Sequence, residues 1–129
     1  MRIPSANTIL HLSTSKFLIH LNLSLFVKKF QILFRYRCGM DSISPHQDNE
    51  VGLDVHAPIA SLSFGATRLF EFTPVDGAQQ APIGKVGIKL IGGSYLVMRY
   101  PTNIFWKHAI PKQPGIREPR LNITFRVLK

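Results

Sequence analysis

The chain has 129 residues, of which 45% are hydrophobic and 18% charged, so its composition fits one globular domain and excludes a disordered chain. Sixteen basic residues against seven acidic ones give a net charge of +9. This charge suits a polyanion such as nucleic acid, although a basic protein without such a partner would carry it equally well. The single cysteine, Cys38, excludes an internal disulfide, and no apolar run is long enough for a membrane-spanning helix.

The first 33 residues contain no acidic side chain and no motif with recognisable chemistry. Their apolar stretch at 17–27 resembles the hydrophobic part of a targeting signal, but His20 and Asn22 interrupt it. A strand or helix of the domain is the preferred interpretation, and a leader or targeting segment is the alternative. We therefore divide the chain into an unassigned segment, 1–33, and a domain, 34–129. We expect an intracellular protein, nuclear or cytoplasmic, with organelle targeting as the alternative.

From residue 34 onward, short β-type runs alternate with turn signals. The runs lie at residues 59–64, 69–72 (a continuation or neighbour of the first), 86–91, 94–99, 104–110 and 121–128. Turns are predicted at Asp76-Gly77, inside a loop at 74–84, and at Gly92-Gly93. This spacing predicts a mainly β sandwich or barrel, with any helix in the first third of the chain.

His46 and Asp48 form a His-x-Asp pattern, the first feature that suggests chemistry. Side chains two residues apart on an extended segment point the same way, so one imidazole and one carboxylate can meet one metal ion. A second imidazole would complete a two-His-one-carboxylate triad of the kind that binds Fe(II), and His108 is the best candidate. The short pattern alone, in a chain with five histidines, favours a solvated loop pair.

Residues 120–126 alternate completely between polar and apolar side chains. We expect the apolar face to pack into a core; it consists of Leu121, Ile123 and Phe125. The opposite face carries two guanidinium groups and two hydrogen-bonding side chains, Arg120, Asn122, Thr124 and Arg126. Alternation alone favours solvent for this polar face. If it lined a cavity instead, its two arginines would suit a dicarboxylate.

Together these signals resemble the AlkB family, oxygenases that depend on Fe(II) and 2-oxoglutarate. The resemblance covers about three quarters of the chain and rests on four segments in the family's order and spacing, residues 35–50, 58–72, 93–112 and 118–126. It implies a double-stranded β-helix (jelly-roll) core with little helix, which the short upstream segment could leave incomplete at its N-terminus.

The resemblance also implies the residues that bind iron and 2-oxoglutarate. The implied iron ligands are His46, Asp48 and His108. The implied co-substrate residues are Tyr36 and the polar face of the last strand: Arg120 for the far carboxylate with help from the Tyr36 hydroxyl, Arg126 for the near carboxylate, and Asn122 and Thr124 along the pocket. No catalytic residue beyond the metal site is implied. Glu50 would contact the extruded base, with a solvated loop glutamate as the equal alternative.

The implied reaction is oxidative dealkylation of N-alkylated bases in DNA or RNA, which releases succinate, CO₂ and an aldehyde. Two positions depart from the family pattern: Phe34 replaces an asparagine that contacts the co-substrate, and Cys38 replaces an aspartate. The alternatives are a dioxygenase of the same type that acts on protein or a small molecule, a catalytically weak nucleic-acid-binding remnant, and a structural β-sandwich. The last would leave the joint placement of the five metal and arginine positions unexplained.

Overall fold

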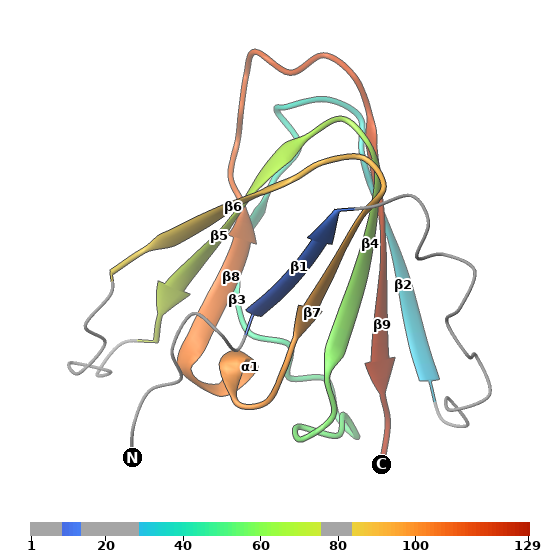
Figure 1. The fold of residues 1–129 in the computed structure, drawn as a ribbon, viewed down its shortest axis with the longest axis vertical. Helices are drawn as coiled ribbons and strands as arrows, with labels where there is room; N and C mark the ends of the chain where they lie inside the picture. The colour runs from blue at the N-terminus through green and yellow to red at the C-terminus, as the bar shows by residue number, and fades with distance from the viewer. Residues whose placement is uncertain (1–8, 14–28, 76–83) are drawn as a thin grey trace.

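The computed structural model describes residues 9–13, 29–75 and 84–129, which form two antiparallel sheets and one short helix (Figure 1). The five-stranded sheet contains, in spatial order, β1 (Ile9–Ser13), β7 (Ser94–Met98), β4 (Ile59–Gly65), β9 (Arg120–Val127) and β2 (Lys29–Tyr36). The four-stranded sheet contains β3 (Ile43–His46), β8 (Trp106–Ile110), β5 (Arg68–Pro74) and β6 (Val86–Leu90). The helix is α1 (Thr102–Phe105). The expected mainly β architecture is confirmed.

From β4 onward the strands largely follow the predicted runs, but two expectations are wrong. β5 is neither a continuation nor a neighbour of β4, because the two strands belong to opposite sheets and only residues 66–67 connect them. The described helix, α1, lies in the last third of the chain, as a single turn between β7 and β8. Four residues are too few to produce a helical period in the sequence. The turn at Gly92-Gly93 is observed, whereas Asp76-Gly77 lies outside the described residues.

The boundary at residue 34 remains a prediction, although two strands begin before it. β1 pairs with β7, and β2 pairs with β9 from Lys29 onward. Both strands are therefore part of the five-stranded sheet. Among the residues that the structure describes, no helix has the length and apolarity needed to cross a bilayer.

β9 faces the interior with its polar side chains, although its apolar side chains were expected there. Its four polar side chains are buried between the sheets, whereas Leu121 points outward and is 40% exposed. The expectation that the apolar face packs into the core is wrong, because the space between the sheets holds a polar pocket. Apolar contacts fill the rest of that space, around Phe72, Leu90 and Leu96.

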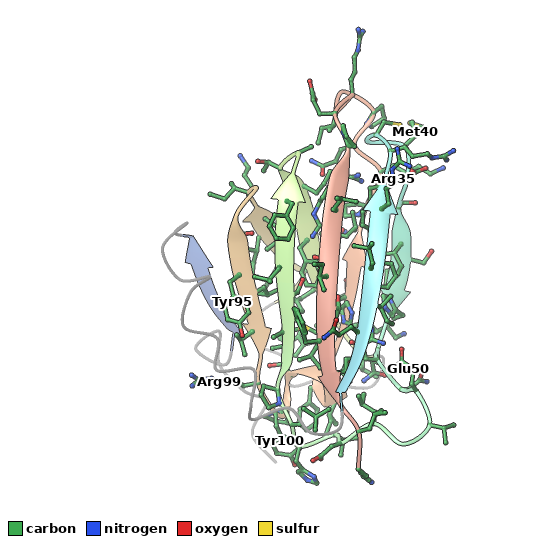
Figure 2. All side chains as sticks on the ribbon, turned by 90° about the vertical axis from the view of Figure 1, so that its right-hand side faces the viewer. Arg35, Met40, Glu50, Tyr95, Arg99 and Tyr100 are labelled. Atoms are coloured by element: carbon green, nitrogen blue, oxygen red, sulfur yellow. The ribbon has the colours of Figure 1, made fainter. Side chains whose placement is uncertain are left out.

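The outer face of the five-stranded sheet has one apolar residue on each of four neighbouring strands, of which Figure 2 labels Tyr95. The register aligns Leu33 of β2, Ile123 of β9, Leu62 of β4 and Tyr95 of β7 in one row across four strands. Leu33 is 65% exposed, and Arg35 projects from the same face two residues along β2. This row of apolar side chains therefore lies on the outer face of the sheet, opposite the polar face of β9.

Arg68, at the start of β5, is almost fully buried and bonds to two loops. Its guanidinium donates to the carbonyl oxygens of Cys38, Asp41 and Pro111, at 3.1, 2.8 and 2.8 Å. Carbonyl oxygens thus take the place of a carboxylate partner, since a buried guanidinium must satisfy its donors. The loops that follow β2 and β8 are thereby held side by side.

Candidate metal and co-substrate site

His46, Asp48 and His108 meet between the two sheets. Each offers one ligand atom, and these atoms all lie within 4.8 Å of one another. The Nε2 atoms of His46 and His108 are both 3.7 Å from Oδ1 of Asp48. Two imidazole nitrogens and one carboxylate oxygen form the donor set that suits Fe(II) with open coordination positions. The two residues of the His-x-Asp pattern and His108, the candidate second imidazole, are therefore brought together.

The pairing of β3 with β8 explains why two of these residues meet although they are distant in sequence. His46 and His108 are direct partners in the antiparallel register, and their ring centroids are 4.4 Å apart. Side chains of directly opposed residues project from the same face of a sheet. Asp48 follows two residues after β3 ends and turns its carboxylate back toward both rings.

Hydrogen bonding of His46 and burial of His108 favour forms of the two imidazoles that can bind a cation. Nδ1 of His46 lies 2.8 Å from the carbonyl oxygen of Ser44, which makes Nδ1 the protonated nitrogen and leaves the Nε2 lone pair free. Burial lowers the pKa of His108 to about 3, with smaller contributions from His46 and Arg126. His108 is therefore neutral at pH 7, which is the form that binds a metal.

Arg126 is the counter-ion of the carboxylates in this site. Its Nη2 donates to Oδ1 of Asp48 at 2.5 Å, and its Nη1 donates to Oε1 of Glu50. Burial nevertheless raises the pKa of Asp48, against the lowering effect of Arg126. Since the arginine occupies only Oδ1, the other carboxylate oxygen of Asp48 is left for another partner.

Unpartnered buried atoms support the fit of a cation and an anion to this pocket. Among the described residues, Oδ2 of Asp48 and Nδ1 of His108 are buried without a hydrogen-bond partner, and so are Nε of Arg120 and Nε of Arg126. Buried polar atoms normally have partners, so a cluster of exceptions indicates a binding site. The oxygen suits a metal ion, and the guanidinium nitrogens suit carboxylates.

Arg120 lies in the same pocket, 2% exposed, with its guanidinium carbon 5.2 Å from the centre of the Tyr36 ring. Its Nη2 donates to Ser63 Oγ and to Asn122 Oδ1, each at 2.9 Å. No described carboxylate forms an ion pair with it, and burial lowers its pKa. A buried cation held only by neutral groups provides a place for an anion.

Hydrogen bonds along the polar face join the remaining pocket residues. Ser61 Oγ donates to Asn122 Oδ1 at 2.7 Å, and Asn122 Nδ2 donates to Thr124 Oγ1 at 2.8 Å. Ser61 and Ser63 were not predicted as site residues, although their alternation with Ala60 and Leu62 could have indicated one polar face of β4. The lining drawn from both sheets consists of Phe34, Tyr36, Ile43, His46, Asp48, Ile59, Ser61, Phe70, Leu96, Met98, His108, Ile110, Arg120, Asn122, Thr124 and Arg126.

Three further positions from the sequence analysis have distinct surroundings. Glu50 is exposed apart from its ion pair with Arg126, and Figure 2 places it near the beginning of β2. Phe34, which replaces the asparagine of the family pattern, lines the pocket without a polar group. Cys38 is a half-buried free cysteine whose carbonyl oxygen accepts a hydrogen bond from Arg68.

Comparison with known proteins agrees with this geometry. Residues 18–126 match the family model of the 2OG-Fe(II) oxygenase superfamily, and the chain belongs to this superfamily. Its cofactor and co-substrate are accordingly iron(II) and 2-oxoglutarate, and the expected AlkB-like character is confirmed by relatives with AlkB names.

Two human proteins illustrate this relationship. The DNA oxidative demethylase ALKBH2 of Homo sapiens is 41% identical over 100 residues, which cover 75% of this chain and 38% of that protein. The human alpha-ketoglutarate-dependent dioxygenase alkB homolog 3 is 41% identical over 97 residues, which cover 72% of this chain and 34% of that protein. The chain thus spans less than two fifths of the length of either relative.

A solved structure supports the fold. The protein described as "The structure of OsALKBH1" superposes with a TM-score of 0.57 at 21% identity, over 75% of this chain and 47% of that one. At this identity the likeness concerns the fold alone, and it confirms the expected jelly-roll core.

Proposed function

We propose that this chain uses Fe(II), 2-oxoglutarate and O₂ to remove alkyl groups oxidatively from N-alkylated bases in DNA or RNA. The observation that carries the proposal is the pairing, in one buried pocket, of a two-His-one-carboxylate cluster with a guanidinium group that no described carboxylate neutralises. A metal ion and a dicarboxylate are the two ligands that this pairing suits.

In this proposal each residue has a separate task. His46, Asp48 and His108 hold the iron, and Arg126 keeps the Asp48 carboxylate oriented through its 2.5 Å hydrogen bond. Arg120 binds the far carboxylate of 2-oxoglutarate, with Tyr36 beside it and with Asn122 and Thr124 along the pocket wall. When bound, the iron supplies the oxidative chemistry that turns the N-alkyl carbon into a hydroxyalkyl group.

The products follow from that step. The hydroxyalkyl group on nitrogen falls apart to an aldehyde and the unmodified base, while 2-oxoglutarate becomes succinate and CO₂. The pocket lies between the sheets, so a base stacked inside a duplex would have to be extruded or supplied by a single strand.

Two features favour a nucleic-acid substrate. The net charge of +9 attracts phosphates, and the DNA oxidative demethylases among the relatives share about two fifths of their aligned residues with this chain. Glu50 lies at the end of the site and could contact a base made cationic by alkylation of a ring nitrogen. Such a contact would require it to share its carboxylate with Arg126.

The test begins with anaerobic titration of Fe(II) in the presence of 2-oxoglutarate. We expect the weak visible charge-transfer band of the ternary complex, and its absence would favour a nucleic-acid-binding remnant. Succinate release is then compared between a methylated single-stranded oligonucleotide and the same sequence without methyl groups. Stimulation by the methylated strand alone, with aldehyde formed in equal amount, supports the proposal. Succinate release at the same rate with and without either oligonucleotide would indicate a protein or small-molecule substrate instead.

A further inference from the structure

The side-chain amide of Asn103 lies against the backbone of Asp48. Asn103 Nδ2 donates to the Asp48 carbonyl oxygen at 2.7 Å, and the Asp48 N–H donates to Asn103 Oδ1 at 3.0 Å. A side-chain amide that satisfies both backbone groups of one residue imitates the hydrogen bonds of a neighbouring strand. The two residues are 55 positions apart in the sequence, so this contact joins separate parts of the fold.

Asp48 needs such a partner because the sheet ends before it. The ladder between β3 and β8 stops at the pair His46 and His108, and Asp48 follows β3 outside any strand. The backbones of both histidines are therefore fixed by strand pairing, whereas the backbone of Asp48 is not. The Asn103 amide supplies the two hydrogen bonds that the ladder no longer provides.

A second amide strengthens the same junction from the opposite direction. Gln47 Nε2 donates to the carbonyl oxygens of Asn103 and Ile104, at 2.7 and 2.9 Å. Asn103 belongs to α1, which runs directly into β8 and so into His108. α1 thus continues along the chain into β8, the strand of His108, and its Asn103 side chain holds the backbone of Asp48.

We propose that Asn103 is a positioning residue for the metal site. It acts through Asp48: its amide fixes the backbone from which the carboxylate projects toward the two imidazoles. This inference rests on the proposed function, because it requires Asp48 to be a metal ligand. Partners that orient ligands typically change metal affinity by about 10- to 100-fold when they are removed.

The test measures Co(II) affinity from the ligand-field absorption of the metal, with the full chain and without oxygen turnover. Asn103→Ala is compared with the wild type and with Asn49→Ala, a matched control at an exposed asparagine next to Asp48. We expect Asn103→Ala to bind Co(II) at least about tenfold more weakly, with an altered absorption spectrum, while Asn49→Ala binds within about twofold of the wild type. Circular dichroism sets the measuring temperature, at which each variant is fully folded.

The outcomes separate the two proposals. If the wild type itself binds no Co(II), the proposed metal site fails. If the wild type binds and folded Asn103→Ala binds equally well with an unchanged spectrum, the role of Asn103 is overturned and the amide serves stability alone. Should Asn103→Ala not fold, Asn103→Asp decides the question, since it keeps the acceptor for the Asp48 N–H and loses the donor to the Asp48 carbonyl. Its added negative charge would by itself attract a cation, so weaker Co(II) binding supports the proposal, and equal or tighter binding overturns it.

Discussion

Arg126 and Asp48 form an ion pair of 2.5 Å in which both side chains are at most 3% exposed. Breaking such a pair by removing one partner leaves an uncompensated charge in the interior and costs about 3–5 kcal/mol. We expect Arg126→Ala to lower the free energy of unfolding of the metal-free protein by about this amount. Saturating Co(II) should restore part of the loss, because a cation again faces the Asp48 carboxylate. Thermal unfolding with and without Co(II) measures both effects, with Arg117→Ala as an exposed control.

Asp48→Ala should remove metal binding and leave the fold largely intact. Arg126 keeps Glu50 as its partner in this variant, so the buried guanidinium is not left alone. We expect Co(II) affinity to fall by more than about 100-fold, since a direct ligand is lost, while the circular dichroism spectrum stays unchanged. Asp54→Ala, in the following loop, is the control. Global loss of structure in Asp48→Ala would argue for a structural carboxylate instead.

Arg120→Ala should raise the KM for 2-oxoglutarate by about 10- to 100-fold, which corresponds to one charge-assisted hydrogen-bond partner of about 1.5–3 kcal/mol. Arg120→Lys keeps the charge and loses the paired donors, so we expect an intermediate KM. Succinate release at varied 2-oxoglutarate concentration measures this dependence. An unchanged KM in Arg120→Ala would move the co-substrate away from this end of the pocket.

His108 should make the metal-free protein less stable as the pH falls. Burial lowers its pKa from 6.5 to about 3, so below pH 6.5 the unfolded chain takes up a proton that the folded protein does not. The stability contribution is complete above the unfolded pKa and declines by about 1.4 kcal/mol per pH unit between pH 6.5 and the folded pKa. Chemical unfolding at pH 7.5 and pH 5 should therefore show a smaller pH dependence in His108→Asn than in the wild type. Equal dependence in the two proteins would assign the effect to other groups.

Gly39 should not tolerate a side chain. A Cβ at this position would lie 1.7 Å from the carbonyl oxygen of Gln113, which belongs to the loop that follows β8. Because Gly39 and Gln113 are also joined by a 2.8 Å backbone hydrogen bond, the two loops cannot separate without losing it. We expect Gly39→Ala to lower the free energy of unfolding by about 1–3 kcal/mol. Gly115→Ala, in the same loop with nothing within 4 Å, should leave it nearly unchanged.

Local patterns were sufficient to predict most strands, but the choice of a metal cluster over a solvated loop pair depended on the family resemblance. The period-2 alternation of residues 120–126 predicted that β9 has one polar and one apolar face, and the His-x-Asp pattern indicated two of the three clustered residues. Alternation could not say which face of β9 is inside, because that depends on a second sheet opposite it. The preference for solvent on the polar face was therefore wrong.

The residues that the sequence did not indicate act through contacts between distant segments. Arg68 bonds to carbonyl oxygens from two loops, and Asn103 bonds to a backbone 55 positions away. Neither residue belongs to a local period or a short motif, since backbone groups accept and donate whatever side chain they carry. α1 escaped prediction for a related reason, as a single turn placed by the strands on either side of it.

The candidate ligands of iron and of the far carboxylate belong to different layers of the sandwich. His46 and His108 belong to β3 and β8, and Asp48 follows β3, whereas Arg120 belongs to β9 in the other sheet. A metal ion alone would bind residues of the first layer only. 2-Oxoglutarate bound at the metal by one end and at Arg120 by the other would link the two layers. By mass action, such a ligand lowers the population of states in which the two layers separate. Proteolytic nicking should accordingly be slowest when metal and co-substrate are present together.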